Sequence, residues 1–320
     1  MKRLLIVPVV LLLAGCAPAS PVSSADDFEL RVGALTTQNV LTLCQASGGL
    51  DTPIEEAGGA VTASDPFPAF APAAEALASG HIDVGSSGAT GVLTALAGNP
   101  DLVIVAVERN DNDSQGIVAA AGSGIESIED LSGRTVAINE GGTGDYLLRK
   151  ALDEHGMSID DVDAVNLAPA DAATAFSSGQ VDAWATWDQY LVSAQVDLDA
   201  TLVAYAGDFG AQNPSVHVVS RAFADAHPSG VNALYRGLVD CADEVAADPS
   251  ILAEAYRDAG VSDAVAEEII AHRVPTIAPA DEEFAAEFAE LAEFYAEQGM
   301  TDGVIDTSSA TADVRTWVEG

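Results

Sequence analysis

Short apolar segments alternate with stretches of helical periodicity through the first two thirds of the chain. Strands are predicted at residues 30–35, 82–85, 102–107, 116–119, 135–138, 181–184 and 216–219. Between them, helical patterns include residues 71–79, 145–155 and 170–178. This alternation predicts an α/β fold with parallel sheets. Seven or more strands exceed the needs of one small domain.

The pattern changes after His227 and Pro228, where the chain becomes wholly helical. Helices are predicted over residues 231–247, 251–259, 265–271 and 282–298. The last of them carries a single apolar stripe made of Phe284, Phe288, Leu291 and Tyr295. We expect these side chains to face the core.

The length of the chain and an internal repeat both indicate two lobes. A chain of 320 residues is about twice the usual domain size of ~150 residues, with one large domain as the alternative. The segment Ala-Leu-Ala-Ser-Gly-His-Ile-Asp-Val at 76–84 resembles Ala-Phe-Ser-Ser-Gly-Gln-Val-Asp-Ala at 175–183. In both, Ser-Gly ends a helix, the glycine supplies a left-handed cap, and the chain enters a strand. The repeat therefore predicts two similarly built lobes.

Loops that follow predicted strands hold the candidate ligand contacts. In open parallel sheets, ligands bind beyond the carboxyl ends of the strands. The glycine loop at 139–144 precedes a helix, whose first turn offers unpaired N–H groups and the positive end of a dipole. Together with the hydroxyls of Ser86, Ser87 and Thr90, this loop predicts a binding site without formal charge for a sulfonate, a sulfate or a similar oxyanion. Glycines that merely turn the chain are the alternative.

Two tryptophans flank the end of the strand predicted at 181–184. We expect Trp184 in the core and Trp187 as a wall of the ligand site. An indole face covers apolar carbon and attracts an ammonium group, whose charge the neighbouring Asp188 would complement. The combination suits a short organic sulfonate with an alkyl or aminoalkyl tail.

Enzyme motifs are not found in the sequence. Residues 141–144 do not fit the G-x-G-x-x-G spacing, and no Gly-Lys-Ser/Thr loop occurs. Residues 85–89 fall one residue short of G-x-S-x-G. The five histidines show no metal-ligand spacing, and Lys150 is the one lysine besides Lys2. We therefore expect no catalytic residue, no cofactor and no metal.

The charge of the chain excludes several partners. The sequence has 50 Asp+Glu and 12 Lys+Arg, a formal net charge of −38. Nucleic acid and anionic lipid surfaces need a basic patch on the protein and are excluded. A hydrophobic content of 48% is enough for a buried core and excludes disorder. The acidic surface predicts a halophilic setting, where salt screens the repulsion between carboxylates.

The first 15 residues predict a lipoprotein signal peptide. Lys2 and Arg3 precede an apolar run over residues 4–13, which is too short to span a bilayer. Leu-Ala-Gly-Cys at 13–16 resembles the bacterial lipobox, so Cys16 is the candidate for lipidation. Residues 16–27, rich in Pro, Ser and Ala, then form a tether. An ordinary signal peptide with an incidental cysteine is the alternative.

With Cys16 assigned to lipidation, Cys44 and Cys241 are the two remaining cysteines. An exported protein lies in a compartment that permits disulfides, so the two could pair. Both cysteines lie in apolar, helical surroundings, where a free buried thiol is equally natural. The sequence therefore leaves the disulfide open.

Several longer segments carry a resemblance to a known family. They read Leu-Arg-Val-Gly at 30–33, Ala-Ser-Gly-His-Ile-Asp-Val-Gly at 78–85, Asp-Leu-Ser-Gly-Arg-Thr-Val-Ala at 130–137, Tyr-Leu-Leu at 146–148, Pro-Ala-Asp-Ala at 169–172, Gly-Gln-Val-Asp-Ala-Trp-Ala-Thr-Trp-Asp at 179–188, and Ser-Arg-Ala-Phe at 220–223. From about Leu30 to Glu297, the chain resembles the substrate-binding proteins of ABC importers for aliphatic sulfonates, taurine and nitrate.

The resemblance implies the two-lobed type II fold of periplasmic binding proteins, with a ligand cleft between lobes that are joined by two crossing strands. Lobe 1 would comprise residues 28–107 and 220–320, and lobe 2 residues 108–219. Such lobes close on their ligand by a hinge. By this resemblance, the ligand contacts fall on Thr37, Gln38, Asn39, Ser86, Ser87, Ala89, Thr90, Gly142, Thr143, Trp187 and Asp188.

The resemblance also implies a role and a place in the cell. The protein would be a monomer, anchored through Cys16 at the outer face of the cytoplasmic membrane or in the periplasm, that delivers a small anionic solute to ABC permease subunits. Sulfonate binders often have Gly-Tyr-Gln and Gly-Asp-Ala-Pro where this chain has Gly-Ala-Leu-Thr-Thr-Gln at 33–38 and Gly-Ala-Thr-Gly at 88–91. Besides a sulfonate or taurine, the alternatives are therefore nitrate or bicarbonate and a thiamine-pyrimidine precursor. An enzyme on the same fold is the competing class.

Overall fold

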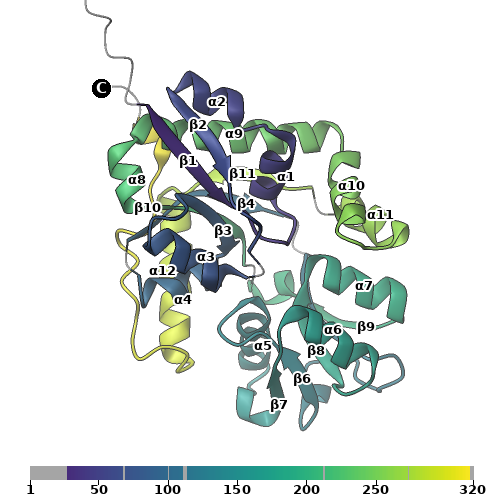
Figure 1. The fold of residues 1–320 in the computed structure, drawn as a ribbon. Coiled ribbons are helices and arrows are strands. Elements are labelled where there is room, and N and C mark those ends of the chain that lie inside the picture. Colours follow the sequence, from purple (N-terminus) through teal and green to yellow (C-terminus); the bar gives the residue numbers. More distant parts are fainter. Residues whose placement is uncertain are drawn as a thin grey trace, which may run out of the picture.

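The computed structural model describes residues 27–67, 69–99, 101–110, 114–211, 213–272 and 274–317. Within these ranges the strands form two sheets, each flanked by helices, and the molecule has two lobes (Figure 1). The predicted signal peptide, Cys16 and the tether up to residue 26 lie outside the described residues. None of the described helices combines the length and the apolar character needed to cross a membrane.

Lobe 1 is built on a six-stranded sheet, counted over the described residues, with strand order β11-β4-β10-β3-β1-β2. Its strands are β1 (Phe28–Gly33), β2 (Gly59–Ala63), β3 (Val84–Gly88), β4 (Leu102–Arg109), β10 (Ser215–Ser220) and β11 (Thr276–Pro279). Its helices are α1 (Val40–Ser47), α2 (Asp51–Glu56), α3 (Phe70–Ala78), α4 (Ala89–Leu96), α8 (Arg221–Ala226), α9 (Pro228–Ala247), α10 (Ser250–Asp258), α11 (Asp263–His272), α12 (Glu282–Glu297) and the 3₁₀ helix η4 (Val314–Trp317).

Lobe 2 has five strands in the described part of the chain, in the order β7-β6-β8-β5-β9. They are β5 (Gln115–Ala119), β6 (Thr135–Ile138), β7 (Asp163–Asn166), β8 (Ala183–Trp187) and β9 (Thr201–Tyr205). The helices are α5 (Thr143–Glu154), α6 (Pro169–Ser177) and α7 (Asp188–Leu198), with the 3₁₀ helices η1 (Glu129–Leu131), η2 (Ile159–Asp161) and η3 (Ala206–Phe209).

The chain crosses between the sheets twice, after β4 and before β10, and these crossings make both sheets mixed. The prediction of parallel sheets is therefore wrong for part of each sheet. β10 enters lobe 1 at the carboxyl end of β3, with Ser215 opposite Gly88, and runs antiparallel to β3 and β4. β5 likewise starts opposite the last residue of β8 and runs antiparallel to it. β10 (Ser215–Ser220) belongs to the sheet of lobe 1. The boundary expected from the sequence, between residues 219 and 220, had assigned most of this strand to lobe 2.

The predicted helices and strands lie within three residues of the observed bounds, but four strands were missed. These strands are β2, β7, β9 and β11, and they are the four edges of the two sheets. β11 also corrects the expectation that the chain is wholly helical after Pro228. Each of the four has mostly half-buried or exposed residues, so none shows the apolar run of a central strand.

The repeated segment occupies the same place in each lobe. It contains the end of α3 and the start of β3 in lobe 1, and the end of α6 and the start of β8 in lobe 2. Gly80 and Gly179 have φ values of 69° and 70°, which confirms the predicted left-handed caps. The parallel cores of the two sheets, β2-β1-β3 and β7-β6-β8, share one connectivity. The lobes are thus similarly built, as the repeat predicted.

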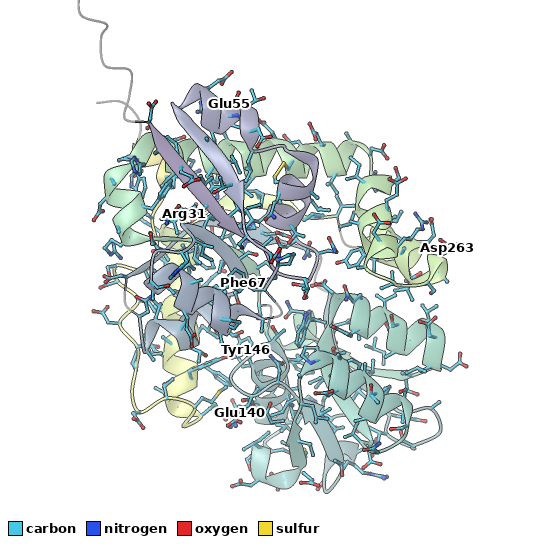
Figure 2. All side chains as sticks on the ribbon, viewed as in Figure 1. Arg31, Glu55, Phe67, Glu140, Tyr146 and Asp263 are labelled. Atoms are coloured by element: carbon cyan, nitrogen blue, oxygen red, sulfur yellow. A yellow bond between two sulfur atoms is a disulfide. The ribbon has the colours of Figure 1, made fainter. Side chains whose placement is uncertain are left out.

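A disulfide between Cys44 and Cys241 joins α1 to α9, and the open question about this pair is answered in favour of the bond (Figure 2). The two cysteines are 197 residues apart in sequence. Both are buried in a core cluster with Leu41 and Leu238. The bond therefore fastens the first helix of lobe 1 to the long helix that returns after lobe 2.

The excess of acidic residues lies mainly on the outer surface, where Glu55 and Asp263 are examples (Figure 2). Of the described carboxylates, three are buried: Asp83, Glu108 and Asp145. Asp83 pairs with Arg31 and Asp145 with Arg149. Glu108 lies 3.3 Å from His217 Nε2 and accepts the Val40 N–H. Each buried carboxylate thus has a partner, as a buried charge requires.

Candidate functional site

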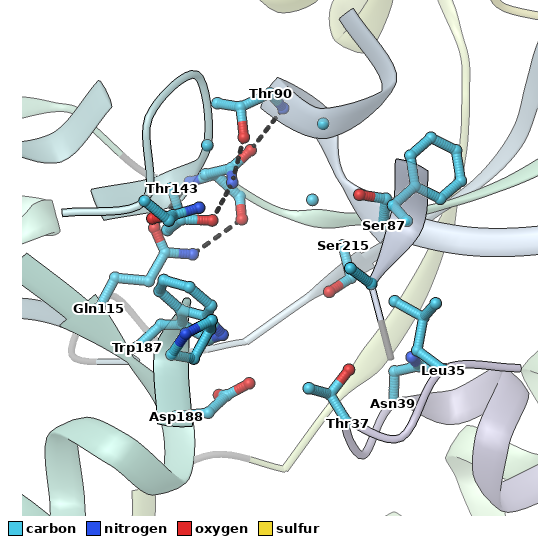
Figure 3. Close-up of a pocket in the computed structure, with 18 of the residues that line it drawn as sticks. Leu35, Thr37, Asn39, Ser87, Thr90, Gln115, Thr143, Trp187, Asp188 and Ser215 are labelled. Atoms are coloured by element: carbon cyan, nitrogen blue, oxygen red, sulfur yellow. Dashed lines mark hydrogen bonds between the residues drawn. The ribbon is translucent and has the colours of Figure 1, made fainter. Parts of the chain in front are cut away.

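A cavity of about 640 Å³ lies between the lobes (Figure 3). Over the described residues, its wall includes the N-cap residues of six helices, three from each lobe: Asn39 (α1), Ala69 (α3), Gly88 (α4), Gly142 (α5), Ala168 (α6) and Trp187 (α7). Each helix follows a strand of the parallel part of its sheet, so the helices begin at the carboxyl ends of those strands. The positive ends of six helix dipoles therefore meet at one cavity, which favours an anion there.

Most of the predicted ligand contacts line this cavity. The nine that do so are Thr37, Gln38, Asn39, Ser87, Thr90, Gly142, Thr143, Trp187 and Asp188. They come from four segments that are far apart in sequence and belong to both lobes. Their contact with a ligand stays a prediction.

Ser86 and Ala89 were also predicted, but they do not line the cavity. Ser86 is fully buried, and its hydroxyl accepts a hydrogen bond from the Asn39 amide at 3.0 Å. Ala89 is 3% exposed and donates its N–H to the Pro214 carbonyl at 2.9 Å. The segment expected to be a loop is the end of β3 followed directly by α4. Because side chains alternate along a strand, Ser87 faces the cavity and Ser86 faces the interior.

Many backbone N–H groups at the helix starts already have partners within the protein. Four such bonds join Val40 to the Glu108 carboxylate (2.9 Å), Thr90 to Asn213 Oδ1 (2.9 Å), Gly144 to Asn139 Oδ1 (2.8 Å) and Asp188 to the Ser114 carbonyl (2.8 Å). At these positions the expected unpaired amides are not present. At these positions an anion would have to use side-chain hydroxyl and amide groups as donors instead.

Asn213 is a site residue that the sequence did not reveal. It is 4% exposed and lies in the second crossing, just before β10. Its amide nitrogen donates to Thr90 Oγ1 of lobe 1 at 3.0 Å and to Thr143 Oγ1 of lobe 2 at 2.7 Å (Figure 3). In the sequence, an asparagine followed by proline is typical of a turn. No local signal therefore distinguishes Asn213 from an ordinary turn residue.

Asn139 shapes the glycine loop that opens α5. Its carbonyl accepts the Gly142 N–H at 3.0 Å, and its Oδ1 accepts the Gly144 N–H. A Cβ atom at Gly142 would lie 1.8 Å from Asn139 Nδ2, and one at Gly144 would lie 2.4 Å from the Ala185 carbonyl oxygen. Close packing thus requires glycine at both positions, and the two hydrogen bonds fix the loop segment that carries Thr143.

The charges around the cavity do not add up to a positive site. Among the described residues of its wall, Arg109 is the one basic side chain, and both carboxylate oxygens of Glu287 bind its guanidinium at 2.9 and 2.8 Å. Glu140 and Asp188 also line the wall. An anion in this cavity would therefore depend on helix ends and neutral donors.

The two tryptophans lie where the sequence placed them relative to the core. Trp184 is 3% exposed, and its ring centroid is 5.9 Å from that of Phe176. Trp187 is half-buried and lines the cavity. Its ring meets Tyr190 edge to face, with centroids 6.2 Å apart. Tyr190 also contacts the Trp184 ring, with centroids 5.7 Å apart.

Helix α12 of lobe 1 contacts the glycine loop of lobe 2. The Tyr295 hydroxyl donates to the Gly141 carbonyl at 3.1 Å, and the Thr94 hydroxyl donates to the same oxygen at 3.2 Å. Burial raises the pKa of Tyr295 far above its usual range, although a hydrogen bond with the Thr90 hydroxyl acts in the opposite direction. Burial also raises the pKa of the neighbouring Tyr146 to about 12. Both phenols are therefore neutral donors near pH 7.

Comparison with known proteins gives the family. The model of the family described as NMT1/THI5 like matches residues 56–251, which is more than half of the chain. The chain belongs to the NMT1/THI5-like family. An aliphatic sulfonates-binding protein of Escherichia coli (strain K12) is 34% identical over 223 residues, which cover 68% of this chain and 69% of that protein.

Solved structures extend the similarity of this NMT1/THI5-like protein to the fold. The alkanesulfonate-binding protein SsuA from Xanthomonas axonopodis pv. citri, bound to MOPS, has a TM-score of 0.79 and 26% identity, covering 89% of this chain and 98% of that chain. These findings confirm the resemblance and the two-lobed fold that the sequence motifs indicated. The desulfurization enzyme DSZB shares the fold at 16% identity, with a TM-score of 0.66 over 90% of this chain and 98% of that chain. The fold alone therefore does not separate a binding protein from an enzyme.

Proposed function

We propose that the protein is the extracytoplasmic solute-binding component of an ABC importer. Its ligand is a small organic oxyanion, with an aliphatic sulfonate as the first choice. The observation that carries the proposal is the meeting of six helix N-caps from both lobes at one cavity. Such helix ends stabilise an anion without a formal positive charge. The relatives named for sulfonates support this choice of ligand.

The wall of the cavity favours an anion that has an organic part. Leu35, Phe70, Leu167 and Trp187 contribute apolar surface beside the polar donors. Nitrate and bicarbonate have no hydrocarbon that this surface could cover, whereas an alkyl sulfonate has. Asp188 and the indole of Trp187 add a place for an ammonium group, which would suit taurine.

Thermal unfolding with a ligand panel tests the proposal. The panel contains ethanesulfonate, taurine, MOPS, nitrate, sulfate and an aminopyrimidine, each added to the exported chain in molar salt. Ethyl methyl sulfone serves as a matched control because it keeps the tetrahedral sulfur but has no charge. A ligand at about 1,000 times its Kd stabilises the native state by about 4 kcal/mol. We expect this for a sulfonate and not for the sulfone, and stabilisation by nitrate or the pyrimidine alone would reject the sulfonate.

The enzyme alternative has a direct assay. The relatives named as binding proteins support a binding role, so we expect the purified protein to leave the stabilising sulfonate unchanged. Incubation of equal concentrations of protein and ligand, followed by mass spectrometry of the small molecule, measures this. Release of sulfite or sulfate from the ligand would establish an enzyme and overturn the binding role.

The proposal includes lipid anchoring at Cys16, which is supported by the Leu-Ala-Gly-Cys motif at 13–16. The protein would then hold the solute at the outer face of the cytoplasmic membrane, as a monomer, beside the permease. Expression with a radiolabelled fatty acid should label the wild type and leave Cys16→Ala unlabelled. Equal recovery of both proteins in the soluble extracytoplasmic fraction would show that the anchor is absent.

A further inference from the structure

Asn213 is held on both sides of the cleft. Its backbone N–H donates to Gln115 Oε1 at 3.1 Å, and its carbonyl accepts from Gln115 Nε2 at 2.7 Å. This double hydrogen bond fixes the backbone of Asn213 to the start of β5 in lobe 2. The side chain then reaches Thr90 in lobe 1 and Thr143 in lobe 2. Gly88 makes this approach possible, because a Cβ atom there would lie 2.5 Å from Asn213 Nδ2.

The orientation of the Asn213 amide follows from chemistry. Oδ1 accepts the backbone N–H of Thr90 at 2.9 Å. A backbone N–H can only donate, so the oxygen of the side chain must face it and the nitrogen must face the other way. Nδ2 therefore points at the two threonine hydroxyls, and each of its hydrogens has one hydroxyl oxygen as its acceptor.

A hydroxyl that accepts from Asn213 keeps its own hydrogen for another acceptor. The Thr90 hydroxyl lies near the Tyr295 phenol, whose pKa its hydrogen lowers, and the phenol itself donates to the Gly141 carbonyl. This branch ends inside the protein. The hydrogen of Thr143 has no acceptor within the part of the chain that the structure describes, and Thr143 is half-buried in the cavity wall. This second branch ends at the cavity.

We propose that Asn213 is a specificity-determining positioning residue, which directs the Thr143 hydrogen into the cleft and so favours ligands with an acceptor group at this position. The inference rests on the proposed function and deepens it, because it places the oxyanion of the ligand beside Thr143. A ligand that presents an N–H or ammonium group to Thr143 can use only the second lone pair of the hydroxyl and leaves its hydrogen without an acceptor, so we expect it to bind more weakly. The organic part of the ligand then extends away from the glycine loop.

The Asn213→Asp variant reverses this polarity with almost no change in shape. A carboxylate accepts from both threonines, so the Thr143 hydrogen turns away from the cleft and a negative charge is added. We expect the affinity for ethanesulfonate, measured by titration calorimetry at pH 7.5, to fall by about a hundredfold. Asn99→Asp is the matched control for the added charge, because Asn99 follows the far end of α4 and its Oδ1 accepts the Asp101 N–H.

A pH series separates this role from a merely structural one. Protonation of the new carboxyl removes its charge and restores a donor, so the affinity of Asn213→Asp should recover about tenfold relative to wild type as the pH falls from 7.5 to 4.5. A variant that had only lost its fold would not recover. A constant ratio between the two affinities over this range would overturn the inference.

Thr143 gives a test that does not depend on the folding of Asn213→Asp. Thr143→Val keeps the shape and removes the donor, so affinity should fall about tenfold, and Thr143→Ser should restore most of that loss. In the double variant of Thr143→Val and Asn213→Asp, the two losses should not add, because Asn213 acts through Thr143. Additive losses, or equal affinities of the Val and Ser variants, would overturn the inference.

The proposed function can fail separately from this inference. If wild type binds ethanesulfonate or MOPS and Asn213→Asp binds it equally well at pH 7.5, the function stands and the inference is wrong. If wild type binds no oxyanion of the panel, both fall.

Discussion

Trp184 and Trp187 lie three residues apart on β8, and the rings of both contact Tyr190, with centroid distances of 5.7 and 6.2 Å. Trp184 is 3% exposed and packs against Phe176, while Trp187 lines the cleft. One short strand therefore supplies both a core residue and a residue of the cavity wall.

Substitution of each tryptophan by alanine should separate these two roles. Trp187→Ala should weaken sulfonate binding by about tenfold, because the ligand loses an aromatic wall, and should change the free energy of unfolding little. Trp184→Ala should lower the free energy of unfolding by about 3–5 kcal/mol through the cavity that it leaves. Calorimetric titration and urea unfolding measure the two effects. Unaltered binding by Trp187→Ala would assign its indole to the core.

Gly88 tests the fit between β3 and Asn213. A Cβ atom at Gly88 would lie 2.5 Å from Asn213 Nδ2, so Gly88→Ala must displace this side chain. We expect the affinity to fall by about tenfold, since a displacement of about 1 Å in a binding site has effects of this order. Gly85→Ala is the matched control on the same strand, because the nearest atom to its Cβ would be 3.5 Å away. Equal affinities of the two variants would show that the position of Asn213 has no bearing on binding.

The Cys44–Cys241 disulfide should contribute most of its effect to stability. It closes a loop with a sequence separation of 197 residues, so its removal restores much freedom to the unfolded chain. We expect the double variant Cys44→Ala, Cys241→Ala to lose about 2–4 kcal/mol of unfolding free energy in urea denaturation. Wild type treated with a reductant should behave in the same way. A reductant that left the urea midpoint of wild type unchanged would argue against the bond in solution.

We expect the free energy of unfolding to fall in alkali because of Tyr146. The pKa of its phenol is raised from 10 to about 12 by burial and by Glu290, so the folded state holds this proton more tightly than the unfolded state. The stabilisation is complete below pH 10 and is lost as the pH rises through 12. With about 1.4 kcal/mol for each pKa unit, it amounts to about 3 kcal/mol.

Unfolding free energies measured between pH 8 and 12 check this prediction. Tyr146→Phe should show a shallower decline above pH 10 than wild type. Part of the decline should remain, because the pKa of Tyr295 is also raised. Parallel curves for the variant and the wild type would mean that Tyr146 titrates alike in both states.

The parts of the fold that the sequence predicted are those with a strong local pattern. The central strands β4 and β6 are nearly continuous apolar runs, and the glycine caps at Gly80 and Gly179 have a steric requirement that the sequence displays. The edge strands have half-exposed residues and were missed for that reason. The antiparallel pairing of β10 could not be predicted from the sequence. It depends on the end of the lobe 1 sheet at which the chain returns from lobe 2, and no local pattern records this.

The candidate site divides in the same way. Ser87, Thr143 and Trp187 follow strands with clear patterns, so their place at the cleft could be predicted. Ser86 was misplaced because a shift of the strand end by a few residues turns a loop residue into an inward-facing one. The role of Asn213 arises from contacts with Thr90 and Thr143, which are 123 and 70 residues away in sequence. A turn residue that acts over such distances leaves no local pattern.

The central position of β10 has a consequence for the order in which the lobes are completed. β10 lies between β3 and β4, so the sheet of lobe 1 remains in two pieces until residues 215–220 have emerged during synthesis or translocation. All five strands of lobe 2 precede this point in the described chain, and that lobe can form its sheet first. A chain that emerges from its amino end would thus complete the lobe 2 wall of the cavity before the lobe 1 wall.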